Sequence, residues 1–435
     1  MKIDPAPPRG MKDLLPPEVE LRDRATATIV ATYKRYGFRR VETPALENLG
    51  LLLGSGGGEN EKLIYKILKR GAKLDSVTTQ REEDLADLGL RFDLTVPLTR
   101  YYAHNRAALP DPFKAIQIGP VWRAERPQKG RFRQFTQCDI DILGVASEIA
   151  EIELILATSE ALIELGLERP RIRLNDRRIL TAMATHCGVD PSRHGEFFVA
   201  LDKLDKIGRE GVERELREAG YDEGAIAKLF ALFLSAPNGA SPDFTLERLA
   251  HTIPATREVV EGLRTIVRTV EREAGERYNV VFDPSLVRGM GYYTGPIFEA
   301  VYGGYTSSIA GGGRYDRMVG RLLGHDVPAC GFSIGFERVV SILEERQGLA
   351  GSERDRVAFL FDRDDPLPEV VAAAGRLRSR DRVVSLTPKR RNLAKQLDDL
   401  AGEGFGSYGV FRAGQPATEV KALARRAPGG GGADA

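Results

Sequence analysis

Residues 115–144, AIQIGPVWRAERPQKGRFRQFTQCDIDILG, are the stretch that decides the fold of this chain. Two parts of it, AIQIGPVWRAE and RQFTQCDIDI, alternate between two kinds of side chain, and the polar segment RPQKGR lies between them. Alternation with a period of two is typical of β-strands, because successive side chains point to opposite faces of a sheet. The stretch therefore predicts an antiparallel hairpin with a long loop.

The second strand of this hairpin has one apolar and one polar face. The apolar face carries Thr136, Cys138, Ile140 and Ile142, and the polar face carries Phe135, Gln137, Asp139 and Asp141. A sheet that packs its apolar face on helices leaves its polar face either as a wetted surface or as the floor of a binding site. The pattern alone leaves both interpretations open and favours the wetted surface.

Basic side chains gather on the same hairpin. Arg123 and Glu125 share one face of the first strand, and the loop adds four more cations, Arg126, Lys129, Arg131 and Arg133. Arginine presents a planar fork to phosphate oxygens, so these groups beside carboxylates and an aromatic ring would suit a purine triphosphate. A salt-bridged surface hairpin is the alternative.

Two glycine-rich motifs and one arginine further along the chain are weaker signals. Residues 286–295, LVRGMGYYTG, read equally well as a turn with packed tyrosines. Residues 309–316, IAGGGRYD, lack the GK[ST] ending of a phosphate-binding loop and would simply let the backbone approach a ligand closely. Arg338 lies opposite the apolar face of its helix, where a solvated side chain is expected.

The length of 435 residues suggests about three domains, or two with an insertion. Helices are predicted from Pro16 to Gly37 and from Ser147 to Leu165, the second ended by Gly166. The predicted division is a first part of the core at 1–166, a helical insertion at 167–255, a second part of the core at 256–346, a small α/β domain with a mixed or parallel sheet at 355–427, and a disordered tail at 428–435.

Composition excludes several classes of protein. Hydrophobic residues make up 42% of the chain and charged residues 29%, with no run of about 18 apolar residues that would span a bilayer. The N-terminus lacks a basic stretch followed by an apolar one, so we expect a cytoplasmic protein without a membrane partner. Three separate cysteines and five scattered histidines favour neither disulfides nor a metal site fixed by a protein motif.

Taken in order, the motifs resemble those of histidyl-tRNA synthetases, a family of class II aminoacyl-tRNA synthetases, over nearly the whole chain. PRGMKDLLPPE and YGFRRVETPALE, with Pro44, are similar to the N-terminal segment and the first class motif, which forms dimers. The hairpin is similar to the second motif and GFSIGFER to the third. LVRGMGYYTG and IAGGGRYD resemble the two histidine-specific motifs, and LRFDLTVPLTRYY resembles the histidine-site segment.

This resemblance implies a fold and a set of site residues. The fold is of α/β class, an α+β core with an antiparallel sheet flanked by helices, a helical insertion and a small C-terminal α/β domain like those that bind anticodons. The ATP-binding residues would be Arg123, Glu125, Arg131, Arg133, Phe135 and Arg338. The histidine-binding residues would be Asp93, Leu94, Thr95, Arg123, Gln137, Asp141, Arg288, Tyr292 and Tyr293, with Arg288 and Arg123 as the catalytic pair.

The activity implied is that of a histidine–tRNA ligase. Its substrates would be L-histidine, ATP with Mg²⁺, and tRNA(His), and the protein would be a homodimer. Two departures from the family pattern are present: the motif usually reads RGLDYY, whereas Met290 and Gly291 stand here, and the C-terminal domain is short after EVKALARRA. The alternatives are a catalytically weakened paralogue, either a histidine sensor such as the regulatory subunit of ATP phosphoribosyltransferase or an RNA-binding protein.

The near-neutral net charge of +1 conceals a segregation of charge. Between residues 376 and 395, eight basic side chains stand against the single acid Asp381, which gives a local charge of +7. The segment lies in the domain that the resemblance assigns to the anticodon, so Arg390, Arg391 and Lys395 are predicted to contact tRNA. A solvated helix face is the alternative for part of this run.

Overall fold

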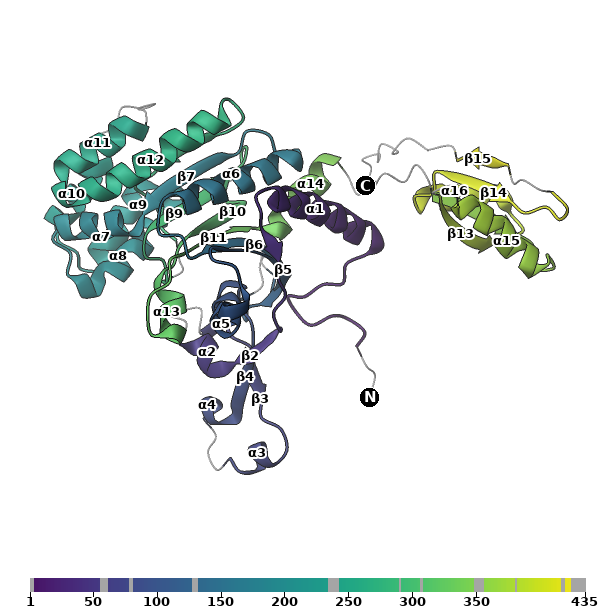
Figure 1. Cartoon of the computed structure of the whole chain (residues 1–435), viewed down its shortest axis with the longest axis horizontal. Coiled ribbons are helices and arrows are strands. Elements are labelled where there is room, and N and C mark those ends of the chain that lie inside the picture. The colour runs from purple at the N-terminus through teal and green to yellow at the C-terminus, as the bar shows by residue number, and fades with distance from the viewer. Residues whose placement is uncertain are drawn as a thin grey trace, which may run out of the picture. The chain divides into compact units, whose positions relative to one another are not determined.

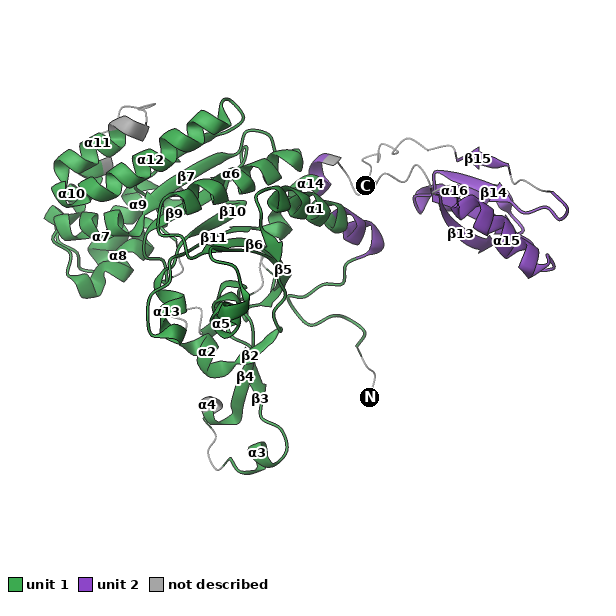
Figure 2. Cartoon of the chain, viewed as in Figure 1, with its two compact units in different colours: residues 1–14, 22–343 green, residues 15–21, 344–435 purple. Residues whose placement is uncertain are grey.

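The structure of the chain is a computed structural model, which describes residues 4–54, 62–77, 81–126, 132–233, 242–288, 291–305, 308–347, 356–379, 382–415 and 419–423. It divides into two compact units, residues 1–14 with 22–343 and residues 15–21 with 344–435 (Figure 2). The predicted tail at 428–435 lies outside the described residues.

The predicted hairpin is confirmed. Strands β5 (Phe113–Trp122) and β6 (Gln134–Leu143) pair antiparallel, with Gln117 opposite Asp139. They lie in an eight-stranded sheet of order β1-β5-β6-β11-β10-β9-β7-β8, antiparallel except at its two ends. The other strands are β1 (Arg39–Arg40), β7 (Arg171–Asp176), β8 (Asn279–Phe282), β9 (Pro296–Val301), β10 (Ala310–Arg314) and β11 (Ala329–Ile334).

Long helices cover the apolar face of this sheet. Helix α6 (Ile149–Glu164) packs on β6 and β11, and α12 (Arg257–Ala274) packs on α6, β7 and β8 (Figure 1). The side chains of Cys138, Ile140 and Ile142 are fully buried as a result. Helix α1 (Pro16–Arg35) is joined to α6 through the ion pairs of Arg35 with Glu160 and Glu164. The predicted helices are therefore confirmed, and α14 (Phe336–Gln347) follows β11.

A second hydrophobic core lies beneath shorter helices and strands of the same unit. Helices α5 (Thr95–Asn105) and α13 (Arg317–Leu323) pack on each other over buried aromatic residues that include Phe92, Phe113 and Tyr315. Next to them a three-stranded sheet extends away from the large sheet (Figure 1). It and its flanking turns comprise β2 (Leu46–Asn48), α2 (Leu49–Leu53), β3 (Lys66–Leu68), α3 (Ala72–Asp75), α4 (Glu82–Leu85) and β4 (Ala86–Leu90). The 3₁₀ turn η2 (Arg106–Ala108) directly follows α5.

Residues 167–255 are helical only from Arg177 onward, because β7 is a strand of the large sheet. The inserted elements are α7 (Arg177–His186), η3 (Pro191–Arg193), α8 (His194–Leu201), α9 (Leu204–Glu218), α10 (Glu223–Phe233), α11 (Pro242–Thr252) and η4 (Pro254–Thr256). Asp176, which ends β7, caps α7 by accepting a hydrogen bond from the backbone nitrogen of Arg178 at 2.7 Å.

The C-terminal unit contains a mixed sheet of order β13-β12-β14-β15, as one of the two predicted forms requires. β12 pairs parallel with β13 and β14, and β15 is antiparallel. Alternate residues of β12 are buried on its two faces, Val357 and Phe359 in one cluster and Ala358 and Leu360 in another. The elements are β12 (Arg356–Phe361), α15 (Leu367–Arg378), β13 (Val383–Pro388), α16 (Leu393–Gly402), β14 (Ser407–Val410) and β15 (Val420–Ala422).

Among the described residues, no helix combines the length and the apolar character that crossing a membrane would require.

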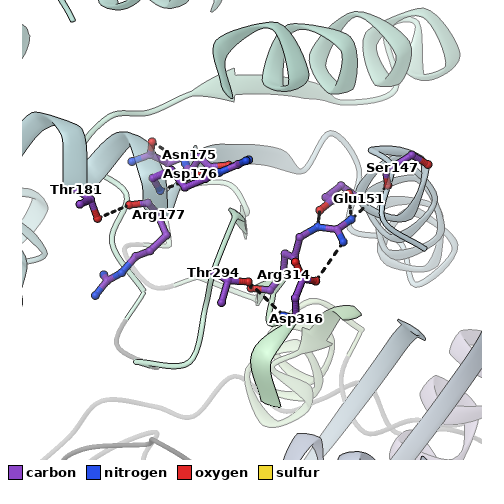
Figure 3. A network of polar contacts seen from close by, with 10 residues as sticks. Ser147, Glu151, Asn175, Asp176, Arg177, Thr181, Thr294, Arg314 and Asp316 are labelled. Atoms are coloured by element: carbon purple, nitrogen blue, oxygen red, sulfur yellow. Dashed lines mark hydrogen bonds and ion pairs between the residues drawn. The ribbon is translucent and has the colours of Figure 1, made fainter. Parts of the chain in front are cut away.

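A buried ion pair fastens the large sheet to α6. Arg314, the last residue of β10, donates from Nε to Glu151 at 2.6 Å, and it also contacts Asp316 at 3.3 Å (Figure 3). The side chains of Arg314 and Glu151 are only 9% and 1% exposed. Arg314 Nη2 also donates to Glu151 Oε2 at 2.9 Å, and two backbone carbonyls, of Val145 and Ser147, accept the other two guanidinium hydrogens. A charge pair that is this deeply buried is tolerated because its hydrogen bonds are complete.

We expect Glu151→Gln to destabilise the protein strongly, because it removes the buried counter-ion of Arg314 and leaves that charge to the partly exposed carboxylate of Asp316. Losing one partner of a buried pair typically costs about 3 to 5 kcal/mol of unfolding free energy. Urea denaturation followed by circular dichroism measures the change. The matched control is Glu213→Gln, which breaks the surface pair of Arg209 and Glu213 and should cost less than about 1 kcal/mol. Equal losses for both variants would contradict the assignment.

Candidate active site

A cavity of about 300 Å³ lies over the polar face of β6. Gln137, Asp139 and Asp141 line it from β6, and glycines of β10 and β11 complete the floor. Asp139 and Asp141 are 3% and 2% exposed, so this face is the floor of a site and not a wetted surface. The wetted-surface interpretation of the pattern was wrong because it considered one strand without the neighbours that cover it.

Four acceptor atoms in this cavity are buried and have no hydrogen-bond partner. They are Asp93 Oδ2, Gln137 Oε1, Asp139 Oδ1 and Asp141 Oδ2. Buried polar atoms are almost always hydrogen-bonded, and each one left unpaired costs free energy. A concentration of unpaired acceptors, three of them carboxylate oxygens, therefore indicates a ligand that brings hydrogen-bond donors and positive charge.

Asp93 is held at the start of α5. Its Oδ1 accepts from the backbone nitrogen of Val96 at 3.0 Å, which leaves Oδ2 facing the cavity. Burial raises the pKa of Asp93 to about 6. Thr95 lines the cavity beside it, whereas Leu94 is a core residue whose backbone carbonyl accepts from Gln117 Nε2 at 2.8 Å.

Asp141 sits deeper, among aromatic rings. The Tyr315 hydroxyl donates to Asp141 Oδ1 at 2.6 Å, and burial raises the pKa of Asp141 to about 7. The Tyr292 ring packs edge-on against Tyr293 and Tyr315, with centroid distances of 4.9 and 6.1 Å. Gly331 of β11 makes room here, because a Cβ at this position would lie 2.0 Å from Asp141 Oδ1.

Arg288 lies across β10. Its Nη1 donates to Glu299 Oε2 at 3.1 Å, and its Nε is buried with no partner. A Cβ on Gly311 would lie 2.4 Å from Nη1, so the glycine-rich strand lets the guanidinium lie flat on the sheet. The sequence predicted that the glycines of the IAGGGRYD motif let the backbone approach a ligand closely. In the structure the group that lies close to Gly311 is the Arg288 side chain.

The other predicted cations are placed unequally. Arg123 donates from Nε to the carbonyl of Phe92 at 3.0 Å, and its guanidinium lies 5.0 Å from the centre of the Phe135 ring. Arg338 lines the cavity and donates to the carbonyl of Ser308 at 2.5 Å, so it is not merely a solvated side chain. Glu125 also lines the cavity.

One of the predicted ATP ligands, Arg133, is not brought to the cavity wall by this structure. Arg133 binds the carbonyls of Glu125 and Arg9, at 3.0 and 3.3 Å, and is not a lining residue. Arg131 lies outside the described residues, as does Lys129. Gly291, which replaces the usual acid, is exposed and is also not a lining residue.

Several cavity residues were not singled out from the sequence. Asp139 could have been found, because the alternation places it on the same face as Gln137 and Asp141. Tyr315 belongs to the quoted IAGGGRYD motif, but its contact with Asp141 joins residues 174 positions apart. Glu299 is not a lining residue, but it pairs with Arg288 at 3.1 Å and with Arg173 at 3.9 Å, and its local sequence gives no signal of this. Among the described residues, no group of three or more His, Cys, Asp or Glu is placed to hold a metal ion.

The fold and the cavity thus define an α/β protein whose ligand site lies on the polar face of an antiparallel sheet. The family model described as Histidyl-tRNA synthetase matches residues 10–339. The chain belongs to this family.

Full-length relatives agree with the family match. The chain is 46% identical to a histidine–tRNA ligase of Leifsonia xyli subsp. xyli over 422 residues, which cover 95% of the chain and 97% of that protein. It is 43% identical over 424 residues to a probable histidine–tRNA ligase of Tropheryma whipplei, covering 94% and 95%. The crystal structure of histidyl-tRNA synthetase from Nostoc sp. PCC 7120 superposes with a TM-score of 0.78 at 27% identity, covering 97% and 95% of the two chains.

A further solved structure shares the fold alone. The ATP phosphoribosyltransferase regulatory subunit/histidyl-tRNA synthetase from Bacillus halodurans C superposes with a TM-score of 0.75 at 19% identity, covering 95% and 100% of the two chains.

The raised pKa of Asp141 makes a prediction about stability. Between pH about 4 and about 7 the folded protein keeps a proton that the unfolded chain has released. This stabilising contribution is complete below the unfolded pKa and is lost as the pH rises through about 7. Asp141→Asn cannot ionise and still accepts from Tyr315, so its melting temperature should exceed that of the wild type by several degrees at pH 8.

Melting curves from pH 5 to pH 8 test this, and the gain of Asp141→Asn should shrink toward the acid end. The matched control is Asp75→Asn, the same chemical change at an exposed position, which should give no gain at either pH. A gain that does not change with pH would contradict the prediction.

Proposed function

We propose that the chain is a histidine–tRNA ligase. It would activate L-histidine with ATP to give histidyl-adenylate and pyrophosphate, and then transfer histidine to the 3′ end of tRNA(His). The observation that carries this proposal is that one cavity combines two kinds of groups. The first kind is the unpaired acceptors of Asp93, Gln137 and Asp141, and the second is the guanidinium groups of Arg123, Arg288 and Arg338.

The unpaired acceptors fit histidine. Asp93, Thr95 and the Gln137 oxygen would receive the three hydrogens of the α-ammonium group, with Leu94 fixing the backbone between the first two. An imidazole presents one donor and one acceptor on fixed vectors, which Asp141 and the tyrosines Tyr292 and Tyr293 can match. Such a site rejects amino acids without these groups, by up to about 10⁴ to 10⁵, because its own buried polar atoms would stay unpaired.

The arginines, together with Phe135 and Glu125, fit ATP. The Phe135 ring would stack on adenine, Glu125 would accept from its amino group, and Arg123 and Arg338 would bind phosphate oxygens through paired hydrogen bonds. Arg131 and Arg133 remain in this proposal as loop residues that would reach ATP when it is bound. The described residues do not offer a donor set for a resident metal, so Mg²⁺ would arrive on the phosphate oxygens of ATP.

The chemistry requires no protein nucleophile. A histidine carboxylate oxygen attacks the α-phosphorus, and the bond to the pyrophosphate oxygen breaks on the opposite side. Arg288 and Arg123 would place fixed positive charge beside the α-phosphoryl oxygens, where negative charge builds up in the transition state. Holding both reactants in one cavity supplies the remaining advantage, through proximity and orientation.

The remaining parts of the chain take their proposed roles from the family. Residues 1–166 and 256–346 would form the catalytic core, 167–255 would contact the acceptor stem, and 355–427 would bind the anticodon. We propose a cytoplasmic homodimer that pairs through the segment containing Pro44. The sensor and RNA-binding alternatives are less well supported, because Arg123, Arg288 and Arg338 are all retained at the cavity.

Arg288→Ala should retain the fold and lose histidine-dependent ATP–pyrophosphate exchange by at least about 100-fold, because a charge aimed at the transition state is removed. Gly311→Ala should act in the same direction, since its methyl carbon would lie 2.4 Å from Arg288 Nη1 and displace the guanidinium.

The matched control for the glycine is Gly375→Ala, where a Cβ meets nothing within 4 Å. It should leave the exchange rate unchanged. Normal exchange in Arg288→Ala would refute the catalytic assignment, and normal exchange in Gly311→Ala would refute the close packing of Arg288 on β10.

The tRNA surface can be tested separately from activation. Arg390, Arg391 and Lys395 are exposed, and Arg390 pairs with Asp399 at 2.7 Å. Replacing Arg391 and Lys395 by alanine should raise the KM for tRNA and flatten its dependence on salt, by about one unit of slope for each lost phosphate contact, while pyrophosphate exchange is unchanged. Arg363→Ala, outside the basic segment, is the control. An unchanged salt slope would exclude this segment from the tRNA surface.

A further inference from the structure

Asp139 is a buried carboxylate in the floor of the cavity that has no role in the reaction as proposed. It lies on β6 between Gln137 and Asp141 and is 3% exposed. Its Oδ1 is buried without a partner, and its Oδ2 accepts from Gln137 Nε2 at 3.4 Å. A buried carboxylate with one free oxygen is costly, so its retention in the floor of the cavity requires a reason.

The neighbouring amide supplies the reason. Gln137 Nε2 donates to both Asp139 Oδ2 and Ser333 Oγ, each at 3.4 Å. The two amide hydrogens are thus turned toward Asp139 and β11, and Oε1 is left buried and unpaired. The nitrogen and oxygen of an amide have nearly the same shape, so only the surrounding donors and acceptors decide which of them faces the cavity.

We propose that Asp139 is a positioning residue that holds the Gln137 amide with its oxygen toward the α-ammonium group of histidine. The inference rests on the proposed function and goes beyond it, because it assigns Asp139 to amino-acid recognition without contact with the reacting atoms. A flipped amide would present its NH₂ group to the ammonium, and two donors would face each other.

Only an ionised carboxylate can exert this control. The Ser333 hydroxyl can donate or accept, so it tolerates either orientation of the amide, whereas a carboxylate accepts only. An asparagine at position 139 could turn its own NH₂ group toward Gln137 and stabilise the flipped amide. The geometry therefore requires a group without hydrogens at this position, which an aspartate supplies.

The surroundings of Asp139 favour its protonated form in the empty cavity, so the ionised form that orients the amide depends on a bound cation. Burial raises the pKa of Asp139, and the carboxylates of Asp141 on the same strand and Asp93 before α5 raise it further. The Ser333 hydroxyl on β11 and the Arg123 guanidinium lower it. A substrate ammonium group brings positive charge into this set and favours the ionised form, so binding of histidine strengthens the interaction that orients its own acceptor.

Exchanging the two side chains gives a direct test. In the double variant Gln137→Glu/Asp139→Asn, the amide and the carboxylate trade places, so the net charge of the cavity is kept and an oxygen faces the ammonium in either orientation. Asp139→Asn alone frees the amide to flip, and Gln137→Glu alone places two carboxylates side by side. We expect each single variant to raise the KM for histidine about 10-fold or more, and the double variant to recover most of that loss.

The readouts are the KM for histidine and for ATP in pyrophosphate exchange, and histidine binding by calorimetry. The KM for ATP and the kcat of Asp139→Asn should stay within about 2-fold of the wild type, because the reacting atoms are not touched. Its melting temperature should not fall, since a buried charge is removed. Asp75→Asn, a surface change of the same kind, should leave every value unchanged.

Three results would overturn the proposal: an unchanged KM for histidine in Asp139→Asn, a loss in kcat instead of KM, or a double variant no better than the worse single variant. Failure of the proposed function is distinguishable, because it would show as no histidine-dependent exchange by the wild type. If the wild type binds histidine without exchange, the calorimetric affinities of the same variants decide the role of Asp139. If it does not bind histidine at all, both proposals are refuted.

Discussion

The burial of acidic groups on the polar face of β6 is the constraint on which the rest of the site depends. Asp93, Asp139 and Asp141 are each no more than 3% exposed, and each has one oxygen without a partner. Such a cluster is unfavourable in the empty protein, because like charges and desolvation both oppose ionisation. Under the proposed function, a ligand with donors and positive charge would remove this penalty, so the protein would give up stability to gain selectivity.

The glycine-rich strand β10 and Gly331 follow from the same constraint. A Cβ on Gly312 would lie 2.0 Å from the carbonyl of Gly331, and one on Gly311 would strike Arg288. Strands with three successive glycines bury little apolar surface and contribute little to stability. The space left by Gly311 lets Arg288 lie close to the sheet, and the space left by Gly331 accommodates the Asp141 side chain. The ion pair of Arg314 and Glu151 stands at the end of this strand, where it fastens β10 to a helix.

How much the sequence could predict depends on how local each feature is. The hairpin was predicted because its alternation is contained in 30 residues, and the helices because their ends carry proline or glycine signals. The burial of the polar face of β6 could not be predicted in this way. It depends on β10 and β11, whose residues follow β6 by more than 160 positions in the sequence. Tyr315 and the cavity position of Arg338 could not be predicted for the same reason. The resemblance to a family supplied most of the candidate residues, but Arg133 and Leu94 show that membership in a motif does not place a side chain at the cavity.

The distribution of charge has the same logic. A net charge of +1 would suggest no preference for polyanions. In the structure Asp93, Asp139 and Asp141 of the cavity are buried, whereas Arg390, Arg391 and Lys395 of the C-terminal unit are exposed. Buried charges act over a few ångströms on one small ligand, and exposed ones act on phosphates through water and salt. The buried acidic groups and the exposed basic groups therefore have separate effects, although their charges offset each other in the net charge.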